Sequence, residues 1–314
     1  MKMRTDLSFP GMPKRFIITS AINDYYFPLL LDLLRSLRDC RLSFDFDIGL
    51  LDVGLNEQNR RLAGAFDVAI KAPGVDIDYP DRVRWEQKAT YFRAMTSRPF
   101  LPDYFPGYEA YMWIDADAWV QTPEALEVML PAAAKDQNLY IASEFDVAYP
   151  KALQGTSWNA WHNDYKNCFS ADIAAAMCLR PFLNVGVFAM SAEAPHWRRW
   201  REILSTALGQ FPEMTMKQFV LEQLSLNLLV YGDNMGAQIM PVEYNWVTIN
   251  GLPAYDERAQ LYVRPMPPHR PISILHLAAQ IKNTSQIIRT TDGRTLERPL
   301  TYSVLLAEKN RRAS

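Results

Sequence analysis

Two aspartates separated by one residue, Asp115 and Asp117, end an apolar run from Tyr111 to Ile114 that has the composition of a buried strand. Buried strands of this kind normally exclude unpaired charge. A pair of carboxylates is tolerated there when a divalent cation neutralises both, and Mg²⁺ and Mn²⁺ prefer such oxygen ligands. Because Mg²⁺ is commonly shared between carboxylates and substrate phosphates, the pair predicts a metal site that binds a diphosphate.

The Asp-x-Asp pattern is common, and the chain contains two further copies at 45–47 and 76–78. At average composition, a chain of this length carries ~1 copy by chance. The copy at 45–47 precedes an apolar run, which favours a strand start. The copy at 76–78 lies between prolines, which favours a turn. Only the pair at 115 and 117 closes an apolar run, and a helix start at 121–124 follows it. Spacing alone leaves a metal site and a structural role equally open.

Composition narrows the class of protein. The chain has 314 residues, 49% of them hydrophobic, and a net charge of −2, so a large core and no nucleic-acid partner are expected. Cys40, Cys168 and Cys178 lack metal-type spacing and favour free thiols in a reducing compartment. No apolar run approaches the roughly 18 residues of a membrane span, and segment 1–14 lacks a signal-peptide core. We expect a soluble, cytoplasmic protein with at most peripheral membrane contact through basic residues of its tail.

Strand and helix patterns alternate along the first third of the chain. Strands are predicted at 15–21, 46–53 and 66–71, and helices at 28–38 and 57–65. This order predicts an α/β fold with a mostly parallel sheet flanked by helices. Ligands bind such sheets at the carboxyl ends of the strands, where Thr19, Ser20 and Ala21 are expected beside the aspartate pair.

The rest of the chain is predicted from the same patterns. It comprises a helix at 82–95 begun by Asp81, strands at 139–143, 182–190 and 272–277, helices at 197–208 and 216–231, and an irregular aromatic segment at 144–171. Neither a dinucleotide-binding glycine motif nor a P-loop is present. A bound cation would therefore have to hold the phosphates.

Four blocks of sequence, taken in order, resemble those of GT-A nucleotide-sugar glycosyltransferases. The similarity is to the retaining group that contains glycogenin and the bacterial lipopolysaccharide galactosyltransferases. The blocks are Tyr91 to Arg93, Trp113 to Asp117, Phe182 to Val187, and Pro241 to Trp246 with Ile274 to Lys282. The last block departs from the family at Ala279, where glycine is usual, and at Asn283-Thr284, where Pro-Trp is common.

The resemblance implies that His276 joins Asp115 and Asp117 as a metal ligand. A lone histidine at a strand end is otherwise read as a hydrogen-bonded structural residue. A nitrogen ligand suits Mn²⁺ better than Mg²⁺, so the expected cofactor is Mn²⁺, with Mg²⁺ as the alternative. Lys282 is expected to meet the diphosphate as a point charge.

The resemblance also assigns substrate contacts. The expected nucleotide-sugar residues are Thr19, Ser20, Ala21, Asn23, Tyr25, Lys88, Arg93, Asp115, Ala116, Asn184, Gly186 and Lys282. Glu222 and Gln223 match the helix that carries the candidate catalytic groups, and one of the pair is expected to approach the sugar, with an exposed charged helix face as the alternative. The expected acceptor contacts are Trp158, Trp161, Tyr244 and Asn245, with core packing as the alternative for the two tryptophans.

The resemblance therefore implies a metal-dependent glycosyltransferase. It would move a hexose from a nucleotide diphosphate sugar, expected to be a UDP-sugar, to a saccharide or lipid-linked acceptor, with retention. Its expected domains are an arm at 1–14, a GT-A catalytic domain at 15–290 and a tail at 291–314. The catalytic domain would divide into a nucleotide-binding half at 15–120 and an acceptor-binding half at 121–290.

Two other functions compete with this one. A nucleotidyltransferase uses a related sheet, but it carries a glycine-rich basic signature in its first loop that Ser20 to Asn23 lacks. A non-catalytic carbohydrate-binding protein of the same fold is the second alternative.

Overall fold

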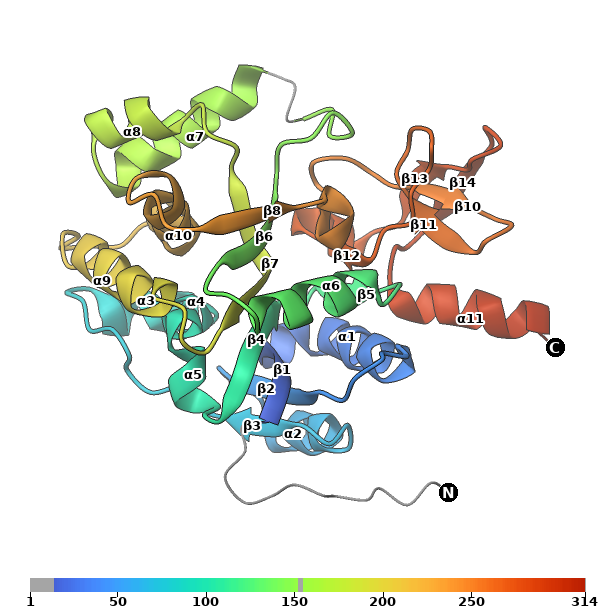
Figure 1. The fold of residues 1–314 in the computed structure, drawn as a ribbon, viewed down its shortest axis with the longest axis horizontal. Helices are drawn as coiled ribbons and strands as arrows, with labels where there is room; N and C mark the ends of the chain where they lie inside the picture. The colour runs from blue at the N-terminus through green and yellow to red at the C-terminus, as the bar shows by residue number, and fades with distance from the viewer. Residues whose placement is uncertain (1–13, 152–154, 314) are drawn as a thin grey trace.

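A seven-stranded sheet forms the centre of the molecule in the computed structural model, which describes residues 14–151 and 155–313 (Figure 1). Its strand order is β3 (Ala69–Lys71), β2 (Asp47–Asp52), β1 (Lys14–Ile22), β4 (Tyr108–Ile114), β7 (Leu183–Ser191), β6 (Leu139–Ser143) and β8 (Ala237–Met240). Only β7 runs antiparallel to its neighbours. The predicted mostly parallel sheet is confirmed.

Helices cover both faces of this sheet (Figure 1). One face carries α1 (Phe27–Asp39), α2 (Glu57–Gly64) and α6 (Glu124–Ala133), and the other carries α5 (Leu101–Tyr104), α9 (His196–Leu208) and α10 (Leu221–Tyr231). Successive strand residues point to opposite faces. In β1, Phe16 and Ile18 therefore join the core under α1, while Ile17 joins the core under α9.

A third apolar cluster lies outside α10. It joins α3 (Arg82–Lys88), α4 (Phe92–Ser97), α7 (Gly155–Cys168) and α8 (Ala171–Met177) to residues of α9 and α10. The 3-10 turn η2 (Arg98–Phe100) packs against the cluster through Phe100, and the turn η3 (Met216–Gln218) contacts α7. The helix predicted at 82–95 is thus two helices, interrupted at Ala89, whose backbone is not helical. The interruption allows Trp85 and Phe92 to meet edge to face, with ring centroids 5.9 Å apart.

The segment expected to be irregular at 144–171 contains the helix α7 and is a correction to the prediction. Trp161, Tyr165 and Cys168 are all buried in the third cluster. Their spacing of four and three residues is that of one helix face. The polar residues between them and the bulk of the aromatic rings obscured this period.

A second, smaller sheet combines the strand that follows β4 with two strands from the C-terminal part of the chain. It pairs β5 (Ala118–Val120), β12 (Ile274–His276) and β9 (Trp246–Val247). The other elements are η1 (Asp24–Tyr26), η4 (Val242–Tyr244), η5 (Ala279–Asn283), the hairpins β10 (Ala254–Asp256) with β11 (Leu261–Val263) and β13 (Gln286–Arg289) with β14 (Thr295–Arg298), and α11 (Tyr302–Ala313). Within the described residues, every helix is too short or too polar to span a bilayer.

Candidate active site

A pocket opens at the carboxyl ends of β1 and β4, as expected for such a sheet. Acidic and basic groups share its lining with aromatic rings, and Tyr26, Tyr91, Arg98, Trp113, Asp115, Asp117, Phe219, Glu222 and Gln223 are among the lining residues. The chemistry of the site therefore depends on how the charged groups pair.

Asp115 and Asp117 lie in the turn that links the two sheets. The Asp115 amide donates to the carbonyl of Gly186 on β7 at 2.8 Å, and the Leu277 amide donates to the carbonyl of Asp117 at 2.8 Å. The backbone of the turn is thus held by the main sheet on one side and by the end of β12 on the other. This explains why two carboxylates remain fixed at the end of an apolar strand.

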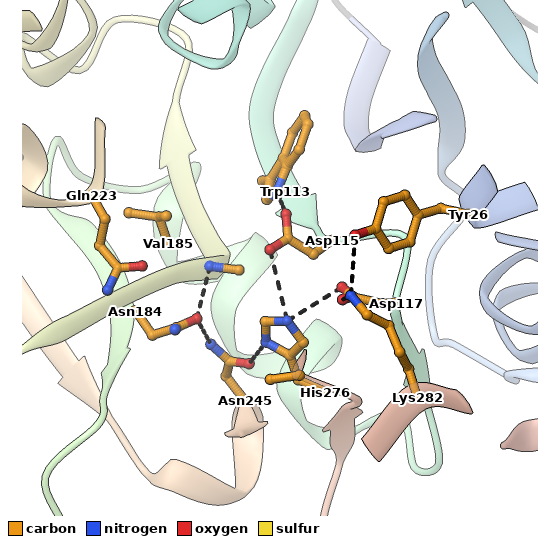
Figure 2. Close-up of polar contacts among 12 residues, drawn as sticks. Tyr26, Trp113, Asp115, Asp117, Asn184, Val185, Gln223, Asn245, His276 and Lys282 are labelled. Atoms are coloured by element: carbon orange, nitrogen blue, oxygen red, sulfur yellow. Dashed lines mark hydrogen bonds and ion pairs between the residues drawn. The ribbon is translucent and has the colours of Figure 1, made fainter. Parts of the chain in front are cut away.

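His276 reaches the aspartates because β12 pairs with β5, placing it opposite Ala118. Its Nε2 lies 3.3 Å from Asp117 Oδ1 and 3.8 Å from Asp115 Oδ2 (Figure 2). One ligand atom from each of the three residues lies within 4.8 Å of the others. Protein ligands sit about 2.0–2.2 Å from a bound cation, so this spacing and this donor set fit a divalent ion such as Mn²⁺.

The second oxygen of each aspartate is occupied by a donor from the protein. Asp117 Oδ2 accepts from Lys282 Nζ at 3.1 Å. Asp115 Oδ1 accepts from the Trp113 indole at 2.6 Å and from the Arg98 guanidinium at 2.9 Å. Figure 2 shows that the remaining oxygens turn toward His276. The protein therefore orients both carboxylates with one free oxygen at the shared point.

Electrostatics in this cluster favours the charged carboxylate. Burial disfavours the charge on Asp117, but His276 and Lys282 outweigh burial and lower the pKa of Asp117 to about 2. Burial likewise disfavours the charge on His276, and Asp117 and Asp115 outweigh it, so the pKa of His276 is raised. The two carboxylates therefore concentrate negative charge at the point where the three ligand atoms meet.

Arg98 is the site residue that the sequence reasoning missed. It is 5% exposed, pairs with both oxygens of Glu222 at 3.1 Å, and lies over the Trp113 ring with its guanidinium carbon 4.4 Å from the centroid. The predicted Arg93 instead bonds to Glu86 at 2.5 Å and is absent from the pocket lining. The block from Tyr91 to Arg93 lies at the start of α4, which borders the pocket, but Arg93 itself pairs with Glu86. Only the position of η2 distinguishes Arg98.

The candidate catalytic pair separates into two environments. Glu222 is fully buried against Arg98, and burial raises its pKa to about 7 despite that arginine. Gln223 lines the pocket and donates to Glu144 Oε1 at 3.2 Å. Both residues border the pocket, and the burial of Glu222 rules out the exposed charged helix face that was the alternative for this position.

Of the other residues predicted to bind the nucleotide sugar, some line the pocket and others do not. Ala21 and Ala116 line the pocket, whereas Lys88 is exposed outside the lining. Thr19 and Ser20 are buried in β1, where Thr19 donates to the Met112 carbonyl. Asn23 caps η1, and Tyr25 is exposed beside it.

Gly186 and Asn184 lie directly behind the group formed by Asp115, Asp117 and His276. A Cβ on Gly186 would lie 2.3 Å from His276 Cε1, so only glycine leaves room for the imidazole. Asn184 accepts from the Gly186 amide at 2.9 Å. Gly186 therefore lies against the His276 ring, and Asn184 bonds to Asn245, the hydrogen-bond partner of that ring.

The residues predicted to bind the acceptor are mostly buried. Trp161 is 8% exposed and stacks on Phe182 at 5.3 Å, and Trp158 packs in the same cluster. Tyr244 bonds to Glu124 on α6. Asn245 is 1% exposed and bonds to His276. None of these four lines the described pocket, because each is committed to packing or to a polar partner.

No protein-family model matches the chain, and no curated protein matches its sequence. Solved structures do match its fold. The galactosyltransferase LgtC, in complex with donor and acceptor sugar analogues, has a TM-score of 0.50 at 17% identity, over 84% of this chain and 88% of LgtC. An active-site mutant of LgtC matches with a TM-score of 0.50 at 17% identity, over 84% of this chain and 87% of that one.

The bifunctional glycosyltransferase WbbM also matches, with a TM-score of 0.52 at 14% identity, over 88% of this chain. The match covers 48% of WbbM, so this chain spans about half of that protein's length. These matches show that the chain has the GT-A fold, and an Asp-Asp-His cluster lies at the end of its central strands. The resemblance to the lipopolysaccharide galactosyltransferases is thereby confirmed at the level of the fold.

Proposed function

We propose that the chain is a glycosyltransferase that transfers a hexose from a UDP-sugar to a saccharide or lipid-linked acceptor, with Mn²⁺ or Mg²⁺ bound by Asp115, Asp117 and His276. One observation carries the proposal. Three ligand atoms, two from the turn that borders the pocket and one from the distant strand β12, come together beside Lys282 and Arg98. Such a set suits a diphosphate whose charge is shared between a cation and basic side chains.

Transfer breaks the bond between the anomeric carbon of the donor and the diphosphate oxygen, and negative charge develops on the departing diphosphate. A divalent cation, when bound, supplies Lewis-acid stabilisation of that charge. Lys282, whose Nζ lies 3.1 Å from Asp117 Oδ2, would serve as the second positive charge. It is held by Asp117 and by the Tyr26 hydroxyl at 3.3 Å, so its position is set before substrate arrives.

Gln223 is proposed to face the donor sugar, with its amide held by Glu144. Glu222, buried behind it, positions Arg98 rather than touching the substrate. Retention of configuration is proposed from the family resemblance. Tyr91 and Phe219 line the pocket with ring centroids 5.7 Å apart, and we assign the acceptor to the side of the pocket that they form.

A cytoplasmic location belongs to the same proposal, supported by the three free cysteines. The experiment that tests the function is calorimetric titration with UDP in the presence and absence of Mn²⁺, followed by an assay of UDP-sugar hydrolysis. UDP is expected to bind only with Mn²⁺, and hydrolysis is expected to be slow but measurable. Tight UDP binding that is indifferent to Mn²⁺ would contradict the proposed metal bridge.

Asp117→Ala provides the first specific prediction. Removing this ligand should abolish metal-dependent UDP binding and transfer, because Lys282 and His276 both lose their shared partner. The matched control is Asp45→Ala, an exposed aspartate of another Asp-x-Asp copy, which should bind UDP as the wild type does. Full transferase activity in Asp117→Ala would exclude the metal assignment.

A further inference from the structure

His276 can bind a cation through Nε2 only if that nitrogen carries a lone pair instead of a proton. Neutral imidazole has one protonated nitrogen and one free nitrogen, and the hydrogen bond at one decides the state of the other. Here Nε2 faces Asp117 Oδ1 at 3.3 Å and Asp115 Oδ2 at 3.8 Å. Two carboxylates attract a proton to Nε2. Without an opposing contact, the metal-free ring would therefore hold its proton where the cation must bind.

The opposing contact is Asn245. Its Oδ1 lies 3.1 Å from His276 Nδ1, and both side chains are buried. A carbonyl oxygen can only accept. As long as this oxygen faces the ring, Nδ1 must carry the proton and Nε2 is left free.

The orientation of the Asn245 amide is fixed by Asn184. The Asn245 Nδ2 group donates to Asn184 Oδ1 at 2.8 Å. Asn184 cannot turn its amide over, because the same oxygen accepts the Gly186 backbone N–H at 2.9 Å, and a backbone N–H can only donate. The oxygen of Asn245 is thereby directed at His276.

The far end of the row is Glu144. One carboxylate oxygen accepts from Asn184 Nδ2 at 2.6 Å and from Gln223 at 3.2 Å, and the other accepts from Asn250 at 3.0 Å. An ionised carboxylate is an acceptor only, so Asn184 is held at both ends by groups with a single possible role. Figure 2 shows the row of Asn184, Asn245 and His276 leading to the aspartates.

We propose that Asn245 is a positioning residue that keeps His276 in the Nδ1-protonated tautomer, with its own amide oriented by Asn184 between the Gly186 amide and Glu144. The row thus overrides the pull of Asp115 and Asp117 on the imidazole proton. It prepares a metal ligand before the cation arrives. Asn245 acts through His276 and needs no contact with substrate.

The tautomer is tested directly by NMR of the protein with ¹⁵N-labelled histidine, free of metal and at a pH that keeps the ring neutral. The chain has four histidines, and His276→Gln identifies the signal of interest. The wild type should show Nδ1–H with an unprotonated Nε2. An Nε2–H signal for His276 in the wild type would overturn the proposal without any variant.

Asn245→Leu removes the acceptor at similar size and should move the His276 proton to Nε2. Mn²⁺ affinity should then fall about 10- to 100-fold, the usual effect of losing the partner of a metal-bound histidine. The matched control is Asn250→Leu, which removes the other amide from Glu144 but lies outside the row. It should keep the wild-type tautomer and the wild-type Mn²⁺ affinity.

Equal Mn²⁺ affinity in Asn245→Leu and the wild type, or the same loss in Asn250→Leu, would overturn the proposal. The Mn²⁺ measurement rests on the metal site proposed above, whereas the tautomer measurement does not. A wild type with the Nδ1–H tautomer but no Mn²⁺ binding would refute the metal site alone. The two failures are therefore distinguishable.

Discussion

Single side chains set the tolerances of this site, and Gly186 is the strictest of them. Its missing Cβ leaves the space in which His276 approaches β7. Gly186 also holds the Asp115 amide through its carbonyl and the Asn184 oxygen through its amide. One residue without a side chain thus supports both kinds of ligand in the cluster. A glycine in a buried strand commonly marks such a close approach.

Gly186→Ala is therefore expected to displace His276 and to abolish Mn²⁺ binding, because the added methyl would overlap the ring. Titration with Mn²⁺ measures the loss, and circular dichroism reports whether the sheet remains. Gly64→Ala serves as the control, since a Cβ there has no neighbour within 4 Å; it should be neutral or slightly stabilising. Wild-type Mn²⁺ affinity in Gly186→Ala would show that the cluster is looser than this packing implies.

At the scale of elements, short segments matter as much as the long helices. The turn η5 follows β12 directly and carries Lys282 to Asp117. Its first residue, Ala279, has a φ of 55°, in the left-handed region where glycine is favoured. The glycine usual at this position in related enzymes thus has a backbone reason, and this chain tolerates alanine there at the cost of strain.

Ala279→Gly should stabilise the protein by about 1 kcal/mol, because glycine relieves the strain of the left-handed backbone. Urea unfolding measures the change. The neighbouring Ala278→Gly is a close control: its φ of −80° and ψ of 151° suit alanine, so glycine should destabilise by about 0.5–1 kcal/mol. If both variants lose stability equally, the strain at Ala279 is absent in solution.

The site also depends on how the whole molecule is assembled. The turn between the two sheets supplies Asp115 and Asp117, and the small sheet supplies His276. Arg98 comes from η2. A ligand that binds all of these at once joins the small sheet to the large one, and it binds only the folded state.

Mn²⁺ together with UDP is therefore expected to raise the melting temperature more than the sum of either alone. At one hundred times the dissociation constant, binding to the native state alone adds about 2.7 kcal/mol. Thermal unfolding with each ligand, with both, and with both plus EDTA measures the coupling. A UDP-dependent shift that survives EDTA would separate nucleotide binding from the metal site.

Several features of this assembly could be predicted from local sequence. The strand before Asp115 is a continuous apolar run, and a short run of this kind favours a buried strand. The alternation of strands and helices predicted the sheet, and the ordered blocks predicted that His276 lies near the two aspartates. Each of these signals is carried by neighbouring residues, so it can be read before the chain is folded.

The aromatic segment now assigned to α7 and the choice between Arg93 and Arg98 could not be predicted in the same way. In α7, the helical period is visible only once Trp161 and Tyr165 are known to share a buried cluster. The two arginines lie within one short stretch of sequence, and their different contacts depend on which one meets Glu222, 124 positions from Arg98. Local patterns carry no information on such a pairing.

By itself, the sequence determined the elements, the sheet they build and the two carboxylates at its edge, because these follow from periodicity and strand ends. Only the tertiary structure decided which basic side chain pairs with each carboxylate and how His276 is held. Asn184 and Asn245 are 61 residues apart, and Asn245 and His276 are 31 apart. Hydrogen-bond direction along that row exists only when β7, β9 and β12 are packed together, since each amide takes its orientation from the partner it meets.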